Sequence, residues 1–273
     1  MRDSGGAMRW YDAHNHLQDD RLGDSQHRLV EESAAAGVLR MVVNGSCESD
    51  WPDVARLARE FPIVLPSYGY HPWYVRERTP GWRDALIRQL DQRPGALGEI
   101  GLDRWIADPD LAAQEECFTW QLTLAAERNL PASLHCLKAW GRLEELLRAG
   151  PRPARGFLLH SYGGPPEMIP GLVRLGAYFS FPGFFLLDRK RRQRETFKQV
   201  PLDRLLVETD APDQLPPPEH RPHPLTAPDG ATPLNHPANL PAIYQALALF
   251  LGTPVEELAS QVERNFLSLF GGI

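Results

Sequence analysis

Residues 10–16 read Trp-Tyr-Asp-Ala-His-Asn-His, a short apolar run that ends in two histidines. Residues 10–13 predict a buried strand, because the run is brief and polar residues follow it. In an open, doubly wound sheet the first strand leads into Gly-x-Gly-x-x-Gly, whereas here it leads into His-x-His. This stretch therefore favours a closed barrel over an open sheet, provided that further strands follow.

Short apolar runs continue along the chain and alternate with longer amphipathic ones. The predicted strands are 10–13, 39–43, 63–67, 96–100, 132–134, 156–159, 177–180 and 204–207. The predicted helices are 26–36, 50–60, 81–92, 114–129, 139–149, 166–175, 188–199, 237–251 and 254–270. Strands that alternate with helices predict a parallel sheet, and eight of them close into a (β/α)8 barrel of the TIM type.

Length and composition suit a single barrel domain over residues 1–273. Hydrophobic residues make up 42% of the chain, enough to fill a barrel and the seams beneath its helices. Residues 1–9 are polar and are expected to form an N-terminal extension. Residues 212–241 contain ten prolines, too many for regular structure, and are expected to lie as a loop over the C-terminal face. That loop either is a stiff connection or shapes a substrate cleft.

Charge, cysteine content and hydropathy limit the possible functions. The net charge of −6 argues against a protein that coats polyanions, but not against an enzyme that holds one nucleic-acid end with the help of metal cations. Three widely spaced cysteines predict no disulfide framework and a reducing compartment. No segment approaches ~18 consecutive apolar residues, and no signal-peptide pattern is present. We expect a cytoplasmic protein with no membrane contact and no stable protein partner.

Histidines and carboxylates stand at the ends of five predicted strands. They are His14, His16, Glu99, His135, His160 and Asp210. Residues i and i+2 of a strand point the same way, so both imidazoles of His-x-His can face the barrel mouth. Any one of the six alone is more simply a satisfied polar group. Together they suit two divalent cations, such as Zn²⁺, Mn²⁺ or Mg²⁺, which activate water for displacement at phosphorus or carbon.

Several motifs resemble those of the TatD family of metal-dependent hydrolases, in the amidohydrolase-like superfamily. They are Asp-Ala-His-Asn-His-Leu (12–17), Gly-Tyr-His-Pro (69–72), Gly-Glu-Ile-Gly-Leu-Asp (98–103), Leu-His-Ser-Tyr-Gly-Gly (159–164), Phe-Ser-Phe-Pro-Gly (179–183), Glu-Thr-Asp-Ala-Pro (208–212) and Arg-Asn-Phe-Leu-Ser-Leu-Phe (264–270). The resemblance covers nearly the whole chain from residue 10 onward. It implies a deoxyribonuclease that cleaves phosphodiester bonds from the 3′ end by metal-activated water, with the end of single-stranded DNA as its substrate.

The resemblance also implies a role for each candidate residue. His14, His16 and Asp210 would hold one ion, and the other would be held by His135 and His160. Glu99 would bridge the two ions. Asp210 would also orient or deprotonate the attacking water, so Asp210 and Glu99 are the expected catalytic residues.

Substrate contacts are expected from four residues around the mouth, which are His71, Trp73, Arg104 and Lys138. His71 either contacts substrate or packs as a hydrogen-bonded wall residue, and Trp73 either stacks on a base or packs in the wall. The chain departs from the family pattern here. Many relatives carry Arg after the histidine of the fifth strand, where this chain has Leu137 and then Lys138, and Arg104 precedes Trp105 where an aromatic residue is common. Arg104 and Lys138 either replace the missing positive charge or are solvated surface groups.

Two other functions remain open. The first is an amidohydrolase-type metallohydrolase that acts on a small ester, amide or phosphoester. A lysine at the end of a middle strand would favour that alternative, but Glu99 holds the bridging position. The second is a non-catalytic metal-binding barrel, which is less consistent with a set of six ligands that is complete.

Overall fold

Eight parallel strands form one sheet in which each strand pairs with the next along the chain. The computed structural model describes residues 8–273, and its strands are β1 (Trp10–Asn15), β2 (Val38–Asn44), β3 (Val64–Tyr68), β4 (Ala96–Asp103), β5 (Ala132–Leu137), β6 (Phe157–Leu159), β7 (Ala177–Pro182) and β8 (Leu205–Glu208). β8 returns beside β1, and just beyond it the Asp210 N–H donates to the His14 carbonyl oxygen at 2.9 Å. The sheet is thus nearly closed, which confirms the predicted (β/α)8 barrel.

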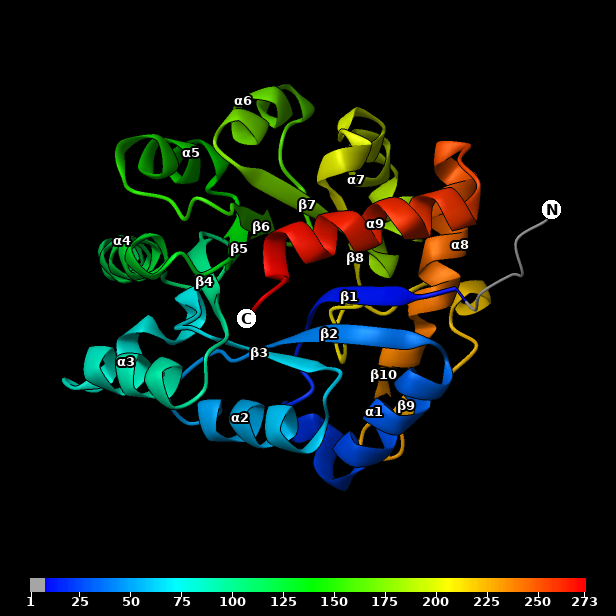
Figure 1. Cartoon of the computed structure of the whole chain (residues 1–273), viewed down its shortest axis with the longest axis horizontal. Helices are drawn as coiled ribbons and strands as arrows, with labels where there is room; N and C mark the ends of the chain where they lie inside the picture. Colours follow the sequence, from blue (N-terminus) through cyan, green and yellow to red (C-terminus); the bar gives the residue numbers. More distant parts are fainter. Residues whose placement is uncertain (1–7) are drawn as a thin grey trace.

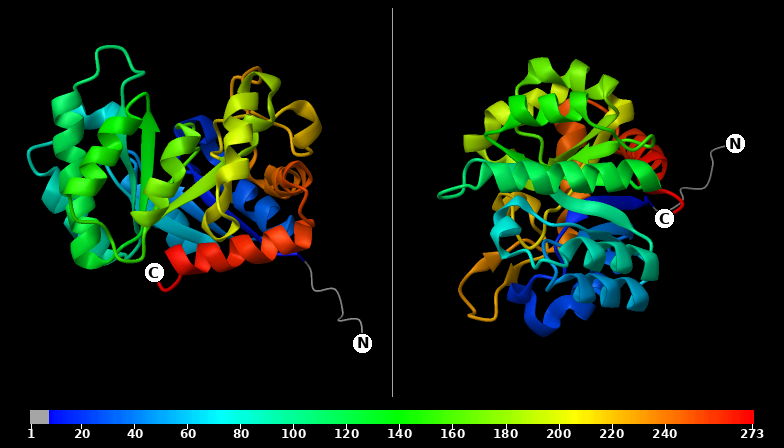
Figure 2. Two further views of the ribbon diagram at one scale, coloured as in Figure 1. Left: turned by 90° about the horizontal axis from the view of Figure 1, so that it is seen from above. Right: turned by 90° about the vertical axis from the view of Figure 1, so that its left-hand side faces the viewer.

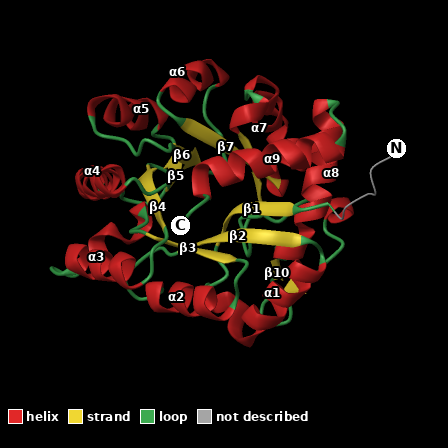
Figure 3. Ribbon diagram, in the orientation of Figure 1, coloured by secondary structure: helices red, strands yellow, loops and turns green. Residues whose placement is uncertain are grey.

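Helices surround the strands on the outside of the barrel (Figures 1 and 3). The α-helices are α1 (Gln26–Ala35), α2 (Trp51–Glu60), α3 (Trp82–Gln92), α4 (Leu111–Arg128), α5 (Trp140–Ala149), α6 (Ile169–Arg174), α7 (Arg191–Thr196), α8 (Leu240–Leu251) and α9 (Val255–Phe270). Short 3-10 helices occupy several connections, among them η1 (Asp20–Ser25), η2 (Pro72–Glu77), η4 (Gly183–Leu186), η5 (Asp188–Lys190) and η9 (Pro237–Asn239). Every predicted helix has a counterpart, and the differences lie at the ends.

The start of α4 illustrates why the predicted ends differ. The periodicity of apolar residues predicts a helix from residue 114, but the helix begins at Leu111. The Asp110 side chain accepts a hydrogen bond from the Ala113 N–H at 3.0 Å and so caps the first turn. A cap satisfies orphaned backbone donors before the apolar face begins, so the hydrophobic pattern alone places the start too late.

Helix α9 packs across one end of the barrel, against β1 and β8 (Figure 2, left). Phe266 and Phe270 on this helix are buried, and the Phe266 ring lies 4.9 Å from that of Tyr11. Burial of one such side chain contributes about 1.5–3 kcal/mol. The opposite end, where the carboxyl ends of the strands meet, is formed by the loops that follow them, and the candidate residues lie there.

The proline-rich segment is more regular than predicted. Between residues 212 and 241 the chain forms a two-stranded antiparallel pair, β9 (Leu225–Thr226) and β10 (Pro233–Leu234), together with short 3-10 helices. His236 caps η9, because its Nδ1 accepts the Ala238 N–H at 3.0 Å while its Nε2 lies 2.7 Å from the Glu32 carboxylate. Prolines are compatible with these elements because they stand at first positions of turns and in a two-residue edge pairing.

The remaining expectations from the sequence are only partly covered by the structure. Within residues 8–273, no helix combines the length and apolar character needed to cross a membrane. Cys47, Cys117 and Cys136 are free thiols. Of the predicted extension 1–9, only Met8 and Arg9 fall among the described residues, and Arg9 pairs with Glu263 at 2.7 Å.

Candidate metal centre and active-site pocket

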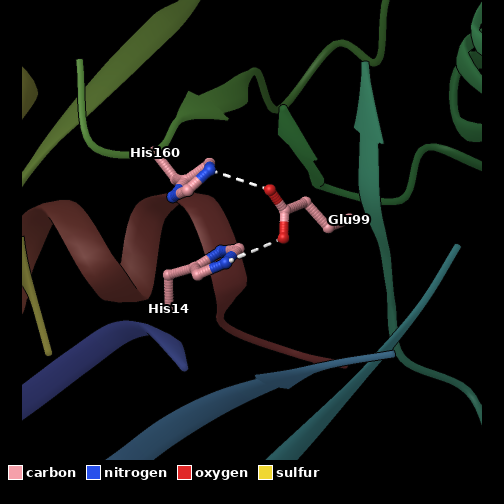
Figure 4. Close-up of side chains that lie close together, drawn as sticks. All are labelled: His14, Glu99 and His160. Carbon is pink, nitrogen blue, oxygen red and sulfur yellow. Dashed lines mark ion pairs between the residues drawn. The ribbon is translucent and has the colours of Figure 1, made fainter. Parts of the chain in front are cut away.

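The six candidate ligands meet at the carboxyl ends of the strands. Glu99 on β4 lies at the centre and directs one carboxylate oxygen toward each of two histidine groups. Figure 4 shows this arrangement for His14 and His160, whose Nε2 atoms lie 3.3 Å from Oε2 and 2.8 Å from Oε1 of Glu99. Residues more than a hundred positions apart in the sequence thus face one another across the barrel mouth.

The first group contains His14, His16, Asp210 and the Oε2 atom of Glu99. The two histidine Nε2 atoms are 3.2 Å apart, and each lies 3.6 Å from Asp210 Oδ1. His16 Nδ1 lies 2.8 Å from the Asn44 carbonyl oxygen, which can only accept a hydrogen bond. His16 Nδ1 therefore carries the proton in the neutral ring, and the lone pair of Nε2 points into the group.

The second group contains His135, His160 and the Oε1 atom of Glu99. His135 Nδ1 and His160 Nε2 each lie 2.8 Å from Oε1 and 3.3 Å from each other. On its other side, His135 Nε2 lies 3.0 Å from Asp103 Oδ2. Donation of Nε2–H to Asp103 leaves the Nδ1 lone pair facing Glu99, which is the arrangement that a metal-binding histidine needs.

The chemistry of these donors fits metal cations. Lone pairs of nitrogen and oxygen converge, although acceptors repel one another unless a proton or a cation lies between them. Asp210 Oδ1 is buried and has no hydrogen-bond partner among the described residues. Burial raises the pKa of Asp210 to about 7 and lowers the pKa of His14 to about 4. Three sets of side chains place ligand atoms within 4.8 Å of one another, and they are His14, Glu99 and His160; His14, His16 and Asp210; and His71, Glu99 and His135. The first two sets belong to the six candidate ligands, and the third adds His71.

Asp12 and Glu208 support the centre from beneath, and both are fully buried. Asp12 Oδ1 accepts the Thr209 N–H at 2.9 Å, and Asp12 Oδ2 accepts the Thr209 hydroxyl at 2.6 Å. Glu208 Oε1 accepts the Ser161 N–H at 2.9 Å, beside His160. These contacts tie β1 to the loop that carries Asp210, and β8 to the loop that carries His160.

Three further supporting residues orient single ligands. Asp103 holds His135, as described above. The Ser133 hydroxyl lies 2.8 Å from His14 Nδ1, and the Gln214 amide donates to Asp210 Oδ2 at 2.6 Å. No role was predicted for any of these supporting residues. Asp12, Asp103 and Glu208 stand inside the quoted motifs, which was a usable signal, whereas nothing in the local sequence marks Ser133 or Gln214.

A pocket of about 290 Å³ opens over the candidate ligands. Its lining includes His71 and Trp73 of the predicted substrate contacts, and also Asp213 and Gln214 from the proline-rich segment. Arg104 and Lys138 are not among its lining residues in the described chain. Instead, Lys138 Nζ lies 4.3 Å from the centroid of the Trp105 ring. The structure thus brings two of the four predicted substrate contacts to the pocket itself.

His71 and Trp73 are held by defined hydrogen bonds. His71 Nδ1 accepts the Trp73 N–H at 3.2 Å, so the neutral ring carries its proton on Nε2, 3.4 Å from Glu99 Oε1. That nitrogen is a donor rather than a metal ligand. Trp73 is 52% exposed, and its Nε1–H donates to Asp103 Oδ2 at 2.6 Å. Asp103 therefore accepts hydrogen bonds from both His135 and an exposed indole.

The rim also contains an arginine that was not predicted. Arg21 follows β1 and makes paired hydrogen bonds to Asp19 and to Asp213, with shortest distances of 2.6 Å to each. It links the loop after β1 to the loop after β8 across the edge of the pocket. Its charge is balanced by two carboxylates, so this rim adds no net positive charge.

A family model described as TatD related DNase matches residues 11–271 of the chain. The chain belongs to the TatD family. This membership agrees with the barrel, with the motifs and with the convergence of the six ligands at its mouth.

TatD relatives cover nearly the whole chain. A protein of Escherichia fergusonii named 3′-5′ ssDNA/RNA exonuclease TatD is 31% identical over 266 residues, which are 96% of this chain and 98% of the relative. The protein of the same name from Erwinia tasmaniensis is 32% identical over 95% of this chain and 99% of its own. Among solved structures, the TatD homolog YjjV of Escherichia coli K12 superposes with a TM-score of 0.87 and 25% identity over 97% of this chain and 99% of its own.

Proposed function

We propose that the protein is a two-metal hydrolase that removes nucleotides from the 3′ end of single-stranded nucleic acid. The observation that carries this proposal is the position of Glu99, whose two oxygens face two separate groups of nitrogen and oxygen donors. The named function of the TatD relatives, 3′-5′ ssDNA/RNA exonuclease, supports the choice of substrate.

Each group of donors would hold one divalent cation. His14, His16 and Asp210 would bind the first, His135 and His160 the second, and Glu99 both. When bound, such cations favour the ionisation of water and stabilise negative charge on phosphodiester oxygens. The mixture of imidazole and carboxylate ligands suits Zn²⁺ or Mn²⁺, and also permits Mg²⁺.

Asp210 would accept the proton of the attacking water at Oδ1. Gln214 fixes the opposite oxygen, so Oδ1 is left toward the site. The backbone of Asp210 is left-handed, with φ of 53°, and its N–H is bound to the His14 carbonyl. Non-glycine residues rarely adopt this conformation except where surrounding contacts impose it, often at functional sites. The contacts of Asp210 thus favour one orientation for proton transfer.

The size and walls of the pocket are suited to the end of a single-stranded nucleic acid. About 290 Å³ is at the lower limit of small-molecule sites, which suits one nucleotide and not a duplex. We propose that Trp73 stacks on the terminal base, because its exposed indole is fixed by Asp103. His71 would donate from Nε2 to an oxygen of the substrate. Arg104 and Lys138 lie outside the lining, and any contact they make would be with more distant parts of the strand.

The test is digestion of 5′-labelled single-stranded DNA and RNA by purified protein in Mn²⁺ or Mg²⁺. Three samples accompany it: protein with EDTA, the variant Asp210→Asn, and the variant Asp203→Asn as a matched control at an exposed position. We expect a ladder that shortens from the 3′ end with wild-type and Asp203→Asn protein, and none in the other two samples.

Metal content, measured on the same samples, separates two negative results. Absence of cleavage while two ions per chain are bound would refute the nuclease and direct the search to small esters, amides and phosphoesters. Absence of bound metal at saturating concentration would refute the metal centre itself.

A further inference from the structure

Residues 188–198, which follow η4 after β7, concentrate positive charge. The segment contains six basic and two acidic residues, a formal charge of +4 in a chain with a net charge of −6. Arg189, Lys190, Arg191 and Arg192 are consecutive, and we call these four residues the α7 basic patch. Three of the four side chains are exposed, and Lys190 is half-buried.

No carboxylate of residues 8–273 lies within ion-pair distance of the patch. The ion pair found for this segment in the described chain joins Lys198 to Glu195, outside the patch. Arg189 and Lys190 lie over the Phe184 ring, at 5.1 and 4.8 Å from its centroid. Burial and the neighbouring Arg189 lower the pKa of Lys190, as expected where cations crowd one another. A run of basic residues is often only a solvent-exposed surface without a partner. Here the Phe184 ring restrains Arg189 and Lys190, so two of the four cations are held in place.

Gln193, which follows the patch directly in the sequence, lies beside the loop that carries His160 and Ser161. β7 ends at the barrel mouth, and α7 stands in the ring between α6 and α8 (Figure 1). Gln193 of α7 reaches the loop after β6, because its Cγ lies 3.9 Å from the position that a Cβ on Gly163 would occupy. The same loop begins with His160 and Ser161, which line the pocket. A single-stranded nucleic acid that leaves the pocket past this loop would pass Gln193, the neighbour of the patch in α7.

We propose that the α7 basic patch binds the phosphodiester backbone of the single strand whose 3′ end occupies the pocket. This inference rests on the proposed function and extends it to the path of the substrate. The pocket holds about one nucleotide, so the rest of a longer strand must lie on the surface. At the pocket rim, Arg21 is already paired with Asp19 and Asp213 and offers no free cation to a phosphate. The guanidinium groups of the α7 basic patch have no ion-pair partner in the described chain and can each bind two phosphate oxygens at once.

The experiment compares two triple variants of the full chain. Arg189→Gln/Arg191→Gln/Arg192→Gln removes three charges from the patch. The control, Arg59→Gln/Arg88→Gln/Arg264→Gln, removes three exposed arginines from α2, α3 and α9. Binding to 5′-fluorescein single-stranded DNA of about 20 nucleotides, longer than a typical single-strand site, is measured by anisotropy in EDTA at several salt concentrations. EDTA prevents hydrolysis, so binding is read independently of activity.

Each phosphate contact contributes about −0.7 to the slope of log affinity against log salt for single strands. If all three arginines contact phosphates, the slope of the patch variant should be shallower by about 2. Its affinity at 0.1 M salt should fall by up to about 100-fold. The control variant should retain the wild-type slope. In Mn²⁺, the patch variant should show a raised KM for the long strand, and the advantage of a long strand over one of about three nucleotides should shrink.

The outcomes separate the two proposals. Equal affinities and slopes for both variants would overturn the patch proposal, even if the enzyme digests DNA. Patch-dependent binding without cleavage would refute the proposed nuclease and leave the binding surface. Patch-dependent binding to anionic lipid vesicles, with none to DNA, would also overturn the proposal, because the patch would then be a membrane contact.

Discussion

Replacement of Asp103 by asparagine tests whether this buried carboxylate orients His135. Asp103 Oδ2 accepts hydrogen bonds from His135 Nε2 at 3.0 Å and from Trp73 Nε1 at 2.6 Å, and Oδ1 accepts the Trp105 N–H at 2.6 Å. Asparagine has one acceptor oxygen, and its NH2 group faces N–H donors in either orientation. At least one of these three donors is therefore left unpaired.

The structure sets the expected size of this effect. A hydrogen bond to a charged group contributes about 1.5–3 kcal/mol, and Trp73 can recover its bond from water because it is half exposed. We therefore expect Asp103→Asn to lower the free energy of unfolding by about 2–3 kcal/mol, or Tm by on the order of 5–10 °C. Loss of the partner of a metal-binding histidine should also weaken binding of one ion about 10–100-fold.

The assays are thermal unfolding with EDTA and metal titration by calorimetry. Asp108→Asn is the matched control, because Asp108 lies in the same connection but is exposed, and its ion-pair partner in the described chain is Arg76. The control should bind metal and unfold like the wild type. If Asp103→Asn also binds both ions with wild-type affinity, Asp103 does not orient His135, and the assignment of the Nδ1 lone pair to a metal is refuted.

Three further predictions concern stability. In Gly101→Ala the new Cβ would lie 1.9 Å from the His135 carbonyl oxygen at φ of 151°, and the free energy of unfolding should fall by more than about 3 kcal/mol. Gly141→Ala on α5 meets nothing within 4 Å and should leave stability unchanged or raise it, so equal urea midpoints for the two variants would contradict this. Burial lowers the pKa of His236, so below about pH 6.5 the unfolded chain binds a proton that the folded chain does not, and the free energy of unfolding should fall. Between about pH 7.5 and 5.5 this fall should be larger for the wild type than for His236→Asn, and equal falls would refute the prediction. Phe179→Ala, at a fully buried position of β7, should cost about 3–5 kcal/mol in urea unfolding, and a loss below about 1 kcal/mol would show that the site collapses without a cavity.

The sequence was sufficient to predict the barrel and to place the six candidate ligands at its mouth. Short apolar runs such as 177–180 and amphipathic runs such as 50–60 are decided by local periodicity, which a single chain displays directly. Strand ends could be read in the same way, and the carboxyl ends of parallel strands must meet. For that reason His14, His160 and Asp210 could be placed together before any contact was known.

The tertiary structure decided how these residues are held and what surrounds them. His14 meets Ser133 across 119 positions of sequence, and Arg21 meets Asp213 across 192. Such contacts depend on strand register and on the closure of β1 against β8, which no local pattern specifies. Periodicity marks the side of an element that is buried, whereas the partner of a buried polar atom is set by the whole barrel. Sequence therefore determined the chemistry available at the mouth, and the tertiary structure determined its geometry, because long-range pairing fixes where each side chain points.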